Sequence, residues 1–306
     1  MRPDSETVRA SEDIISDPLT QVRATAPSAG EDHLLTPTGA RRILMDIHQH
    51  QQQQHWTGLK LQGKLACLPA ADHSVSHSFL KNTALDEDIF TFTIKARLQV
   101  LPTRLNLSIW FPTTQVPHCL HHTTEQITET LSHILVGCFA YKGMYTARHD
   151  RIVDLIVKDI SHHFQASVNM YTHACVNASM FHLCNNQNAF SQLSANTPDV
   201  VVVDEESREV SVLEIACTFD TSLEEAFMTK VIKYQPLVNT ISELGYRCRL
   251  LVFIFGSLGH VHKLVVRGLR LLGMPKKEAK RLAKYCSISA IIGSRHIWRR
   301  RCYLYP

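Results

Sequence analysis

Two acidic residues occupy unusual positions in a pair of valine-rich segments. Asp199 directly precedes the run from Val200 to Val203, and Glu214 lies inside a second run, from Val210 to Cys217. Two short β-branched runs joined by a charged turn predict a hairpin of two strands. A carboxylate inside a buried strand needs a partner or a metal ion, because burying an unpaired charge is costly. The pattern therefore predicts two carboxylates in one hairpin.

Two lysines follow the hairpin on a predicted amphipathic helix from Leu223 to Leu244, which we expect Pro236 to kink or interrupt. Lys230 and Lys233 are three residues apart, so they share one face of this helix. Two carboxylates suit one or two Mg²⁺ or Mn²⁺ ions, and a lysine stabilises charge on phosphoryl oxygens, which together predict phosphodiester hydrolysis. The alternative is that these residues have only structural roles. Asp199 would then be a turn residue, Glu214 an ion-paired strand residue, and the two lysines part of a solvated helix face.

Cysteine and histidine recur at the spacing of a second kind of site. Cys119 and His122 are three residues apart, and His133 and Cys138 are five apart. Four nitrogen and sulfur ligands suit a closed tetrahedral Zn²⁺ site, whose role is structural because no position is left for water. His121 could replace His122 as the second ligand. Chance spacing is the alternative, since the chain contains 18 histidines and lacks the usual Cys-x-x-Cys first half.

Cations at two places in the chain could contact the phosphates of a nucleic acid. One pair stands at the start of a predicted helix, whose N-terminus favours anions. The other group is a run of arginines beside Trp298, and basic residues beside an aromatic ring suit phosphates and stacked bases. Helix capping and a solvated helix end explain the same residues. The candidates are Arg148, His149, Arg299, Arg300 and Arg301.

Composition sets broad limits. The 306 residues are 44% hydrophobic, which is enough for a core, and the formal net charge of +4 permits an anionic partner. We find no signal peptide and no apolar run of bilayer length. The nine cysteines are an odd number, which fits poorly with a complete disulfide framework. We therefore expect an intracellular protein with reduced thiols and no membrane partner.

The order of predicted elements indicates an α/β protein with several segments. From residue 146 onward it runs helix, strand, strand, strand, helix, strand, helix. The expected divisions are a disordered leader (1–40), a helical connector (41–112), a zinc knuckle (113–145), an α/β core (146–262) and a basic helical tail (263–306). In the connector, a Gln/His tract from His48 to His55 is expected to be a polar helix. The segment 78–112 is expected to contain one helix, which ends near Pro102.

The motifs, taken in order, resemble a known family. The element order is similar to the restriction-endonuclease-like fold, whose motif is written PD-(D/E)xK. From Phe79 to the C-terminus the chain looks like the C-terminal region of site-specific non-LTR (LINE-type) retrotransposon polyproteins, with a CCHH variant of their CCHC knuckle. The motifs that carry this resemblance are Leu101-Pro-Thr-Arg104, the Cys/His residues with Glu129-Thr-Leu-Ser-His133, Arg148-His-Asp150, Pro198-Asp199, Glu214, Lys230-x-x-Lys233-Tyr234 and Gly293-Ser-Arg-His-Ile-Trp298.

The resemblance implies a Mg²⁺-dependent endonuclease that nicks target DNA in the nucleus, so that the exposed 3′ hydroxyl primes copying of the element RNA. Asp199 and Glu214 would be the metal-binding carboxylates, and Lys230 would be the lysine displaced from strand to helix. Lys233 and Tyr234 would support it. DNA and element RNA are the implied partners, and Mg²⁺ (or Mn²⁺) and Zn²⁺ are the implied metals. No small-molecule cofactor is implied.

The chain departs from the family pattern at several positions. Ala216 stands two residues after Glu214, where the general motif has lysine. A Tyr- or Phe-x-Asp-Asp motif is missing, so we do not expect a reverse transcriptase in this chain. One alternative is a catalytically inactive retrotransposon remnant that binds nucleic acid through the knuckle and the basic tail. A cysteine hydrolase using Cys217 is a third reading, although no cysteine follows a strand-to-helix turn with an identifiable base.

Overall fold

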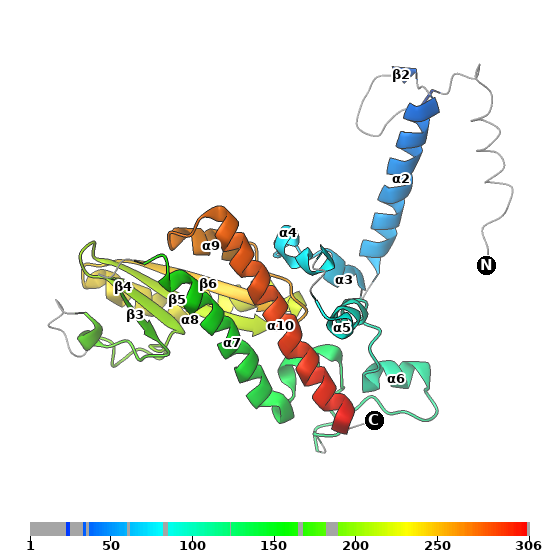
Figure 1. The fold of residues 1–306 in the computed structure, drawn as a ribbon. Helices are drawn as coiled ribbons and strands as arrows, with labels where there is room; N and C mark the ends of the chain where they lie inside the picture. The colour runs from blue at the N-terminus through cyan, green and yellow to red at the C-terminus, as the bar shows by residue number, and fades with distance from the viewer. Residues whose placement is uncertain are drawn as a thin grey trace. The chain divides into compact units, whose positions relative to one another are not determined.

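The computed structural model describes residues 23–24, 33–34, 37–59, 62–81, 85–122, 124–164, 168–181 and 189–304 (Figure 1). The chain divides into two compact units, Met1–Ala66 and Cys67–Pro306. The boundary between them falls inside the expected helical connector. No helix in the described ranges is long and apolar enough to span a bilayer.

The described residues of the first unit form a two-stranded antiparallel pair and two helices. Strand β1 (Arg23–Ala24) pairs with β2 (His33–Leu34), and helices α2 (Pro37–Gly58) and α3 (Gln62–Ala66) follow. The Gln/His tract is helical, as predicted, and no residue of α2 is buried. Glutamines bond to histidines four residues earlier, as Gln52 does to His48 at 2.7 Å. The expected leader lies mostly outside the described residues, and its last four residues already belong to α2.

A mixed four-stranded sheet forms the centre of the second unit. Its strands are β3 (Val168–Thr172), β4 (Val200–Asp204), β5 (Glu209–Thr218) and β6 (Arg247–Gly256), in the order β3-β4-β5-β6. The predicted β4–β5 hairpin is confirmed, with Asp204 opposite Glu209 at its turn. Strands β3 to β5 are antiparallel, whereas β6 runs parallel to β5.

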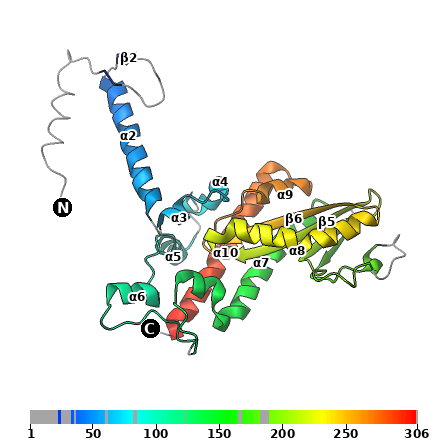
Figure 2. The same ribbon diagram turned by 180° about the vertical axis from the view of Figure 1, so that it is seen from behind.

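Helices cover both faces of this sheet, as the alternation of valines along β4 requires. Val200 and Val202 belong to a core shared with α7 (Lys142–Ser161), α9 (Val265–Leu271) and α10 (Lys276–Leu304). Val201 and Val203 belong to a second core with α8 (Leu223–Glu243). Figure 1 shows α7 and α10 in front of the sheet, and Figure 2 shows α8 on the opposite face. The predicted α/β class is confirmed.

Helix α8 crosses from β5 to the parallel strand β6, and it does so without a break. The expected interruption at Pro236 does not occur, because α8 continues from Leu223 to Glu243. A proline removes one backbone donor from a helix. The neighbouring Leu237 and Ile241 are fully buried against the sheet, and this packing outweighs the local cost.

The segment before the sheet differs from the prediction of a single helix. It contains α4 (His73–Ser76), α5 (Glu87–Arg97) and α6 (Arg104–Trp110). Gln99 after α5 has a φ of 58°, which ends that helix. Thr103, directly after Pro102, then caps α6 by accepting a hydrogen bond from the Asn106 amide. Short helical turns complete the fold, namely Ser78–Lys81, His133–Gly137, Phe139–Tyr141, Ala178–Met180 and Asp220–Ser222.

The basic C-terminal segment is one long helix that is part of the fold. Helix α10 has 29 residues and includes the arginines from Arg299 to Arg301. It packs antiparallel to α7, because His163 near the end of α7 bonds Glu278 at 3.0 Å and Arg148 near its start bonds Ser294 at 2.7 Å. The tail is therefore anchored over its length.

Candidate functional site

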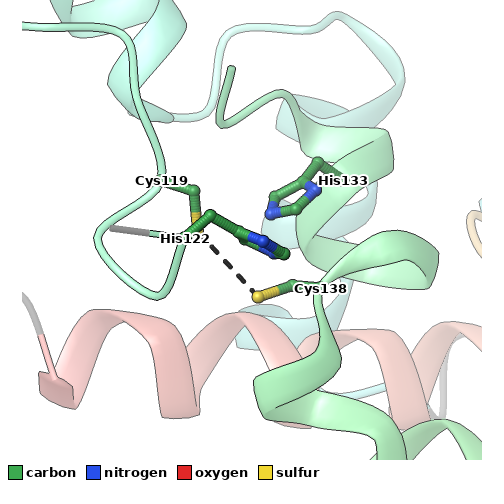
Figure 3. Close-up of side chains that lie close together, drawn as sticks. All are labelled: Cys119, His122, His133 and Cys138. Carbon is green, nitrogen blue, oxygen red and sulfur yellow. Dashed lines mark hydrogen bonds between the residues drawn. The ribbon is translucent and has the colours of Figure 1, made fainter. Parts of the chain in front are cut away.

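Cys119, His122, His133 and Cys138 come together as predicted and are named here the Cys/His cluster. All four ligand atoms lie within 4.8 Å of one another, and the two sulfur atoms are 3.9 Å apart. Figure 3 shows the four side chains converging from a loop and from the turn that begins at His133. Two Zn–S bonds of about 2.3 Å at a tetrahedral angle place the sulfurs about 3.8 Å apart, which agrees with this spacing.

Unpartnered polar atoms also indicate a metal at this cluster. The Nε2 atoms of His122 and His133 are buried and have no hydrogen-bond partner among the residues that the structure describes. Buried polar atoms in native proteins are normally paired, and a metal ion would satisfy both nitrogens. The neighbouring His121 instead lies 3.2 Å from the Tyr141 hydroxyl. The cluster could therefore bind a metal such as zinc, with His122 and not His121 as the second ligand.

Local backbone geometry explains how the two ligand pairs meet. The Cys119 amide donates to the Ile127 carbonyl at 2.8 Å, which folds the loop back on itself. Residues His133–Gly137 form a π-helical turn, in which the Cys138 amide donates to the His133 carbonyl at 2.8 Å. This five-residue turn is wider than an α-helical one and places Cys138 beside His133.

Burial favours the neutral form of two of the ligands, Cys138 and His133, in the metal-free protein. It raises the pKa of the Cys138 thiol to about 11 and lowers the pKa of His133, where the nearby His122 adds to the effect. Metal ligation needs cysteine as thiolate and histidine as neutral imidazole. Binding at neutral pH would thus release a proton from Cys138, while His133 is already in the required form.

A buried ion pair fixes helix α10 to the loop that carries the cluster. Glu129 is 1% exposed and accepts hydrogen bonds from the Arg104 amide at 2.9 Å and from Arg301 Nη2 at 2.8 Å. Arg148 is buried too, and it donates to the Leu135 carbonyl at 3.0 Å. Arg148 and Arg301 therefore join parts of the protein, and neither lies on its exposed surface. Arg299 and Arg300 are exposed.

The acidic residues of the hairpin lie together with one of the two lysines. Asp199 stands at the start of β4, and its Oδ2 accepts the Ile215 amide at 2.7 Å. Glu214 on β5 is 3% exposed and is ion-paired with Lys230 of α8. Lys233 is exposed and donates to the Tyr234 hydroxyl at 3.2 Å. Strand order and the α8 crossover thus bring Asp199, Glu214 and Lys230 to one place.

The surroundings of Glu214 disfavour its ionised form. Burial raises the pKa of Glu214, the charge of Asp199 raises it further, and Lys230 opposes both effects. Glu214 Oε2 is buried, and none of the described residues forms a hydrogen bond with it. Burial and the charge of Glu214 also raise the pKa of Tyr234. In the described ranges, the Cys/His cluster is the one group of three or more convergent metal-ligating side chains; the acidic pair contributes two carboxylates.

His149 lies against Asp199, a contact that its sequence position did not predict. Its Nε2 is 3.4 Å from Asp199 Oδ2 and 3.1 Å from the Ile215 carbonyl, and its Nδ1 is 3.0 Å from Asp150. The hydrogen bond to Asp199 is the main reason that the pKa of His149 rises to about 9. The imidazolium is therefore the form present at neutral pH, and it is a cation beside the acidic pair.

A second buried polar group was missed by sequence reasoning. Asp220 is fully buried at the end of β5 and accepts the Leu258 amide at 2.7 Å and His260 Nδ1 at 2.7 Å. The two side chains are 40 residues apart in the chain, and no spacing rule connects them. Cys217 lies on the same strand, and burial raises the pKa of its thiol, which gives no support to a cysteine nucleophile.

Comparison with known proteins found no family model that matches the chain and no match among curated proteins.

Proposed function

We propose that the second unit is a metal-dependent DNA endonuclease of the restriction-like type, derived from a non-LTR retrotransposon. The element order supports the fold assignment. Helix α7 is followed by the antiparallel strands β3, β4 and β5, then by α8 and by β6 parallel to β5. The proposed PD-(D/E)xK motif maps onto this order with Asp199 before β4 and Glu214 on β5.

The ion pair between Glu214 and Lys230 is the observation that carries the proposal. It shows a buried carboxylate and an amine from different elements meeting beside a second carboxylate, Asp199. The lysine lies on α8, as the resemblance requires, since Ala216 occupies its usual strand position. A purely structural acid on a strand does not need a second carboxylate nearby, because like charges raise the cost of its burial.

The donor set fits a hard divalent cation. Asp199 and Glu214 offer carboxylate oxygens, which Mg²⁺ and Mn²⁺ prefer, and Glu214 Oε2 is a buried oxygen without a partner. When bound there, the ion would polarise the scissile phosphate and lower the pKa of a bound water. The roles of the chain's own groups follow from their contacts.

Each cation near the pair has a distinct role in the proposed reaction. Lys230 neutralises Glu214 before substrate arrives and can turn toward a phosphoryl oxygen, since a quarter of its side chain (27%) is exposed. Lys233 is exposed beside Tyr234 and meets a phosphate nearer the surface. His149 holds Asp199 in place from the α7 side.

The substrate surface is basic and aromatic. Arg299 and Arg300 on α10 are exposed, and the Arg299 guanidinium lies 5.9 Å from the ring centre of Tyr303, which is 71% exposed. Arginine next to an exposed ring suits phosphates and stacked bases. DNA is the proposed substrate, element RNA is a further partner, and the nucleus is the proposed place of action, where the nick would prime reverse transcription by a separate polymerase domain.

One observation favours a second function, a nucleic-acid-binding remnant without activity. Glu214 is already neutralised by Lys230, and the carboxylate pair has no third acidic ligand beside it in the described part of the chain. In that case the Cys/His cluster and α10 would bind nucleic acid, and cleavage would not occur.

Nicking of supercoiled plasmid DNA separates the two functions. We expect the zinc-loaded full chain to convert supercoiled to open-circular DNA with Mg²⁺ or Mn²⁺. Asp199→Asn should abolish nicking but leave DNA binding within about twofold, because removing an acid does not weaken attraction to phosphate. Asp154→Asn, which changes an exposed acid on α7, is the matched control. Full nicking by Asp199→Asn would refute the assignment, and an inactive wild type that binds DNA would support the remnant.

A further inference from the structure

A small cavity lies between helices α7 and α10, away from the acidic pair. Its volume is about 150 Å³, several times the volume of one water molecule. We call it the α7–α10 pocket. Its lining residues come from one stripe on each helix, at spacings of three and four. They are Met144, Ala147, Arg148 and Arg151 on α7, and Ser289, Ile292, Gly293 and His296 on α10.

Two lining residues have buried polar atoms that form no hydrogen bond within the described part of the chain. Arg148 is 3% exposed and its Nε has no hydrogen-bond partner, while Ser289 is 6% exposed and its Oγ has none. Nη1 of the Arg148 guanidinium donates to the Ser294 hydroxyl at 2.7 Å, which holds the group in place. Unsatisfied buried donors in a native protein call for an explanation, and here both are N–H or O–H donors in one cavity.

The glycine of the lining is required by the path of Arg148. A Cβ added at Gly293 would lie 2.6 Å from Arg148 Cγ, which is closer than atoms can approach. The arginine side chain therefore lies directly across α10 at this glycine. The absence of a side chain at residue 293 lets the guanidinium reach the interior of the helix pair.

The charge of the pocket has one sign. Arg148 is buried in it, Arg151 and His296 are exposed at its mouth, and the lining contains no acidic residue. Arg300, also exposed, follows His296 by four residues and so extends the same stripe of α10. Two arginines of α7, facing the Ser289 hydroxyl of α10, supply N–H and O–H donors that match the oxygens of a tetrahedral anion.

We propose that the α7–α10 pocket binds a phosphate group, with Arg148, Arg151 and Ser289 as its donors. Because the exposed Arg300 continues the stripe along α10, the natural source is the backbone of a bound nucleic acid, held on the side of α7 opposite Asp199. That choice of source rests on the proposed function, whereas the phosphate site itself does not. A free phosphorylated molecule would be bound by the same donors, and the salt dependence of DNA binding distinguishes it from a nucleic acid.

Binding of inorganic phosphate tests the site directly. The zinc-loaded full chain is titrated with phosphate, without added Mg²⁺, and the amide signals of Ser289 and Gly293 are followed by NMR. Saturable shifts are expected. Arg151→Ala, at the exposed mouth, should weaken binding about tenfold, and Ser289→Leu, which fills the pocket, should abolish it. Arg270→Ala, which removes an exposed arginine of α9, should change nothing. No saturable shift in the wild type, or equal binding by Arg151→Ala, overturns the proposal.

The salt dependence of DNA binding then identifies the source of the phosphate. With the zinc-loaded chain and no added Mg²⁺ or Mn²⁺, so that cleavage is prevented, Arg151→Ala should reduce the slope of log K against log salt by about 0.9, the value for one lost phosphate contact. Phosphate binding with an unchanged slope supports the site and assigns it to a free phosphorylated molecule. Neither measurement depends on cleavage, so an inactive acidic pair leaves this test intact.

Discussion

Replacing Lys230 with methionine tests the geometry of the acidic pair without any assay of activity. Methionine keeps most of the aliphatic length and removes the ammonium group, so Glu214 is left 3% exposed without its cation. Breaking a buried ion pair costs about 3–5 kcal/mol. Because the Lys230 side chain is 27% exposed, water would replace part of the lost interaction, and we expect a loss of about 2–3 kcal/mol at pH 8.

Protonation of Glu214 sets an upper limit on this loss, and the limit depends on pH. A carboxyl group with an ordinary pKa of 4.5 can be protonated at a cost of about 1.4 kcal/mol per pH unit above that value. The limit is therefore about 5 kcal/mol at pH 8 and about 1.4 kcal/mol at pH 5.5. In Lys230→Met, the pKa of Glu214 is higher in the folded state than in the unfolded chain, so the folded state binds the extra proton. The stability of this variant therefore falls as pH rises above the pKa of Glu214 in the unfolded chain.

Urea unfolding followed by circular dichroism at both pH values measures the effect. Lys233→Met is the control, because Lys233 is exposed and bonds a neutral hydroxyl, so its loss should stay below about 1 kcal/mol. Adding Glu214→Gln to Lys230→Met should restore most of the stability. Equal losses for the two lysine variants, or a Lys230→Met loss that does not shrink at pH 5.5, would show that the pair is not buried as described.

Three further predictions concern other parts of the site. Wild-type protein should contain about one Zn²⁺ per chain by elemental analysis, and Cys138→Ala should contain close to none; equal content would place the metal elsewhere. The pKa of His149, measured by NMR in metal-free protein, should be about 9 and should fall toward 6.5 in Asp199→Asn. The contribution of protonated His149 to stability is complete below pH 6.5 and is lost as pH rises through 9. The difference in unfolding free energy between the wild type and His149→Gln should therefore shrink as pH rises, and a difference that grows with pH would contradict this role of His149. Asp220→Ala should lower the unfolding free energy by about 3–5 kcal/mol, because His260 and two amides lose a buried acceptor; a change below 1 kcal/mol would contradict that role.

The strands and the acidic pair could be predicted because their signals are local. The run from Val200 to Val203 buries both faces, so its hydrophobic pattern is unambiguous. Glu214, inside such a run, stood out for the same reason. The Cys/His cluster was recognisable because its ligands are close in sequence, although only the structure could distinguish His122 from His121.

Features that depend on tertiary packing could not be predicted. Pro236 is a helix breaker by local rules, but burial of its neighbours keeps α8 continuous. Arg148 and Arg301 looked like surface cations, since nothing in the sequence shows that Ser294 and Glu129 would meet them from distant segments. The contact of His149 with Asp199 likewise joins α7 to the start of β4, 50 residues later in the chain.

The rate of DNA nicking by Glu214→Gln tests the central claim most directly. This change keeps the size of the side chain and removes one of the two carboxylates, while the Cys/His cluster and α10 are untouched. With saturating Mg²⁺ and equal DNA binding, we predict that nicking of supercoiled plasmid falls about 1000-fold or more relative to the wild type. Nicking within threefold of the wild-type rate would contradict the claim that Asp199, Glu214 and Lys230 form the site that cuts DNA.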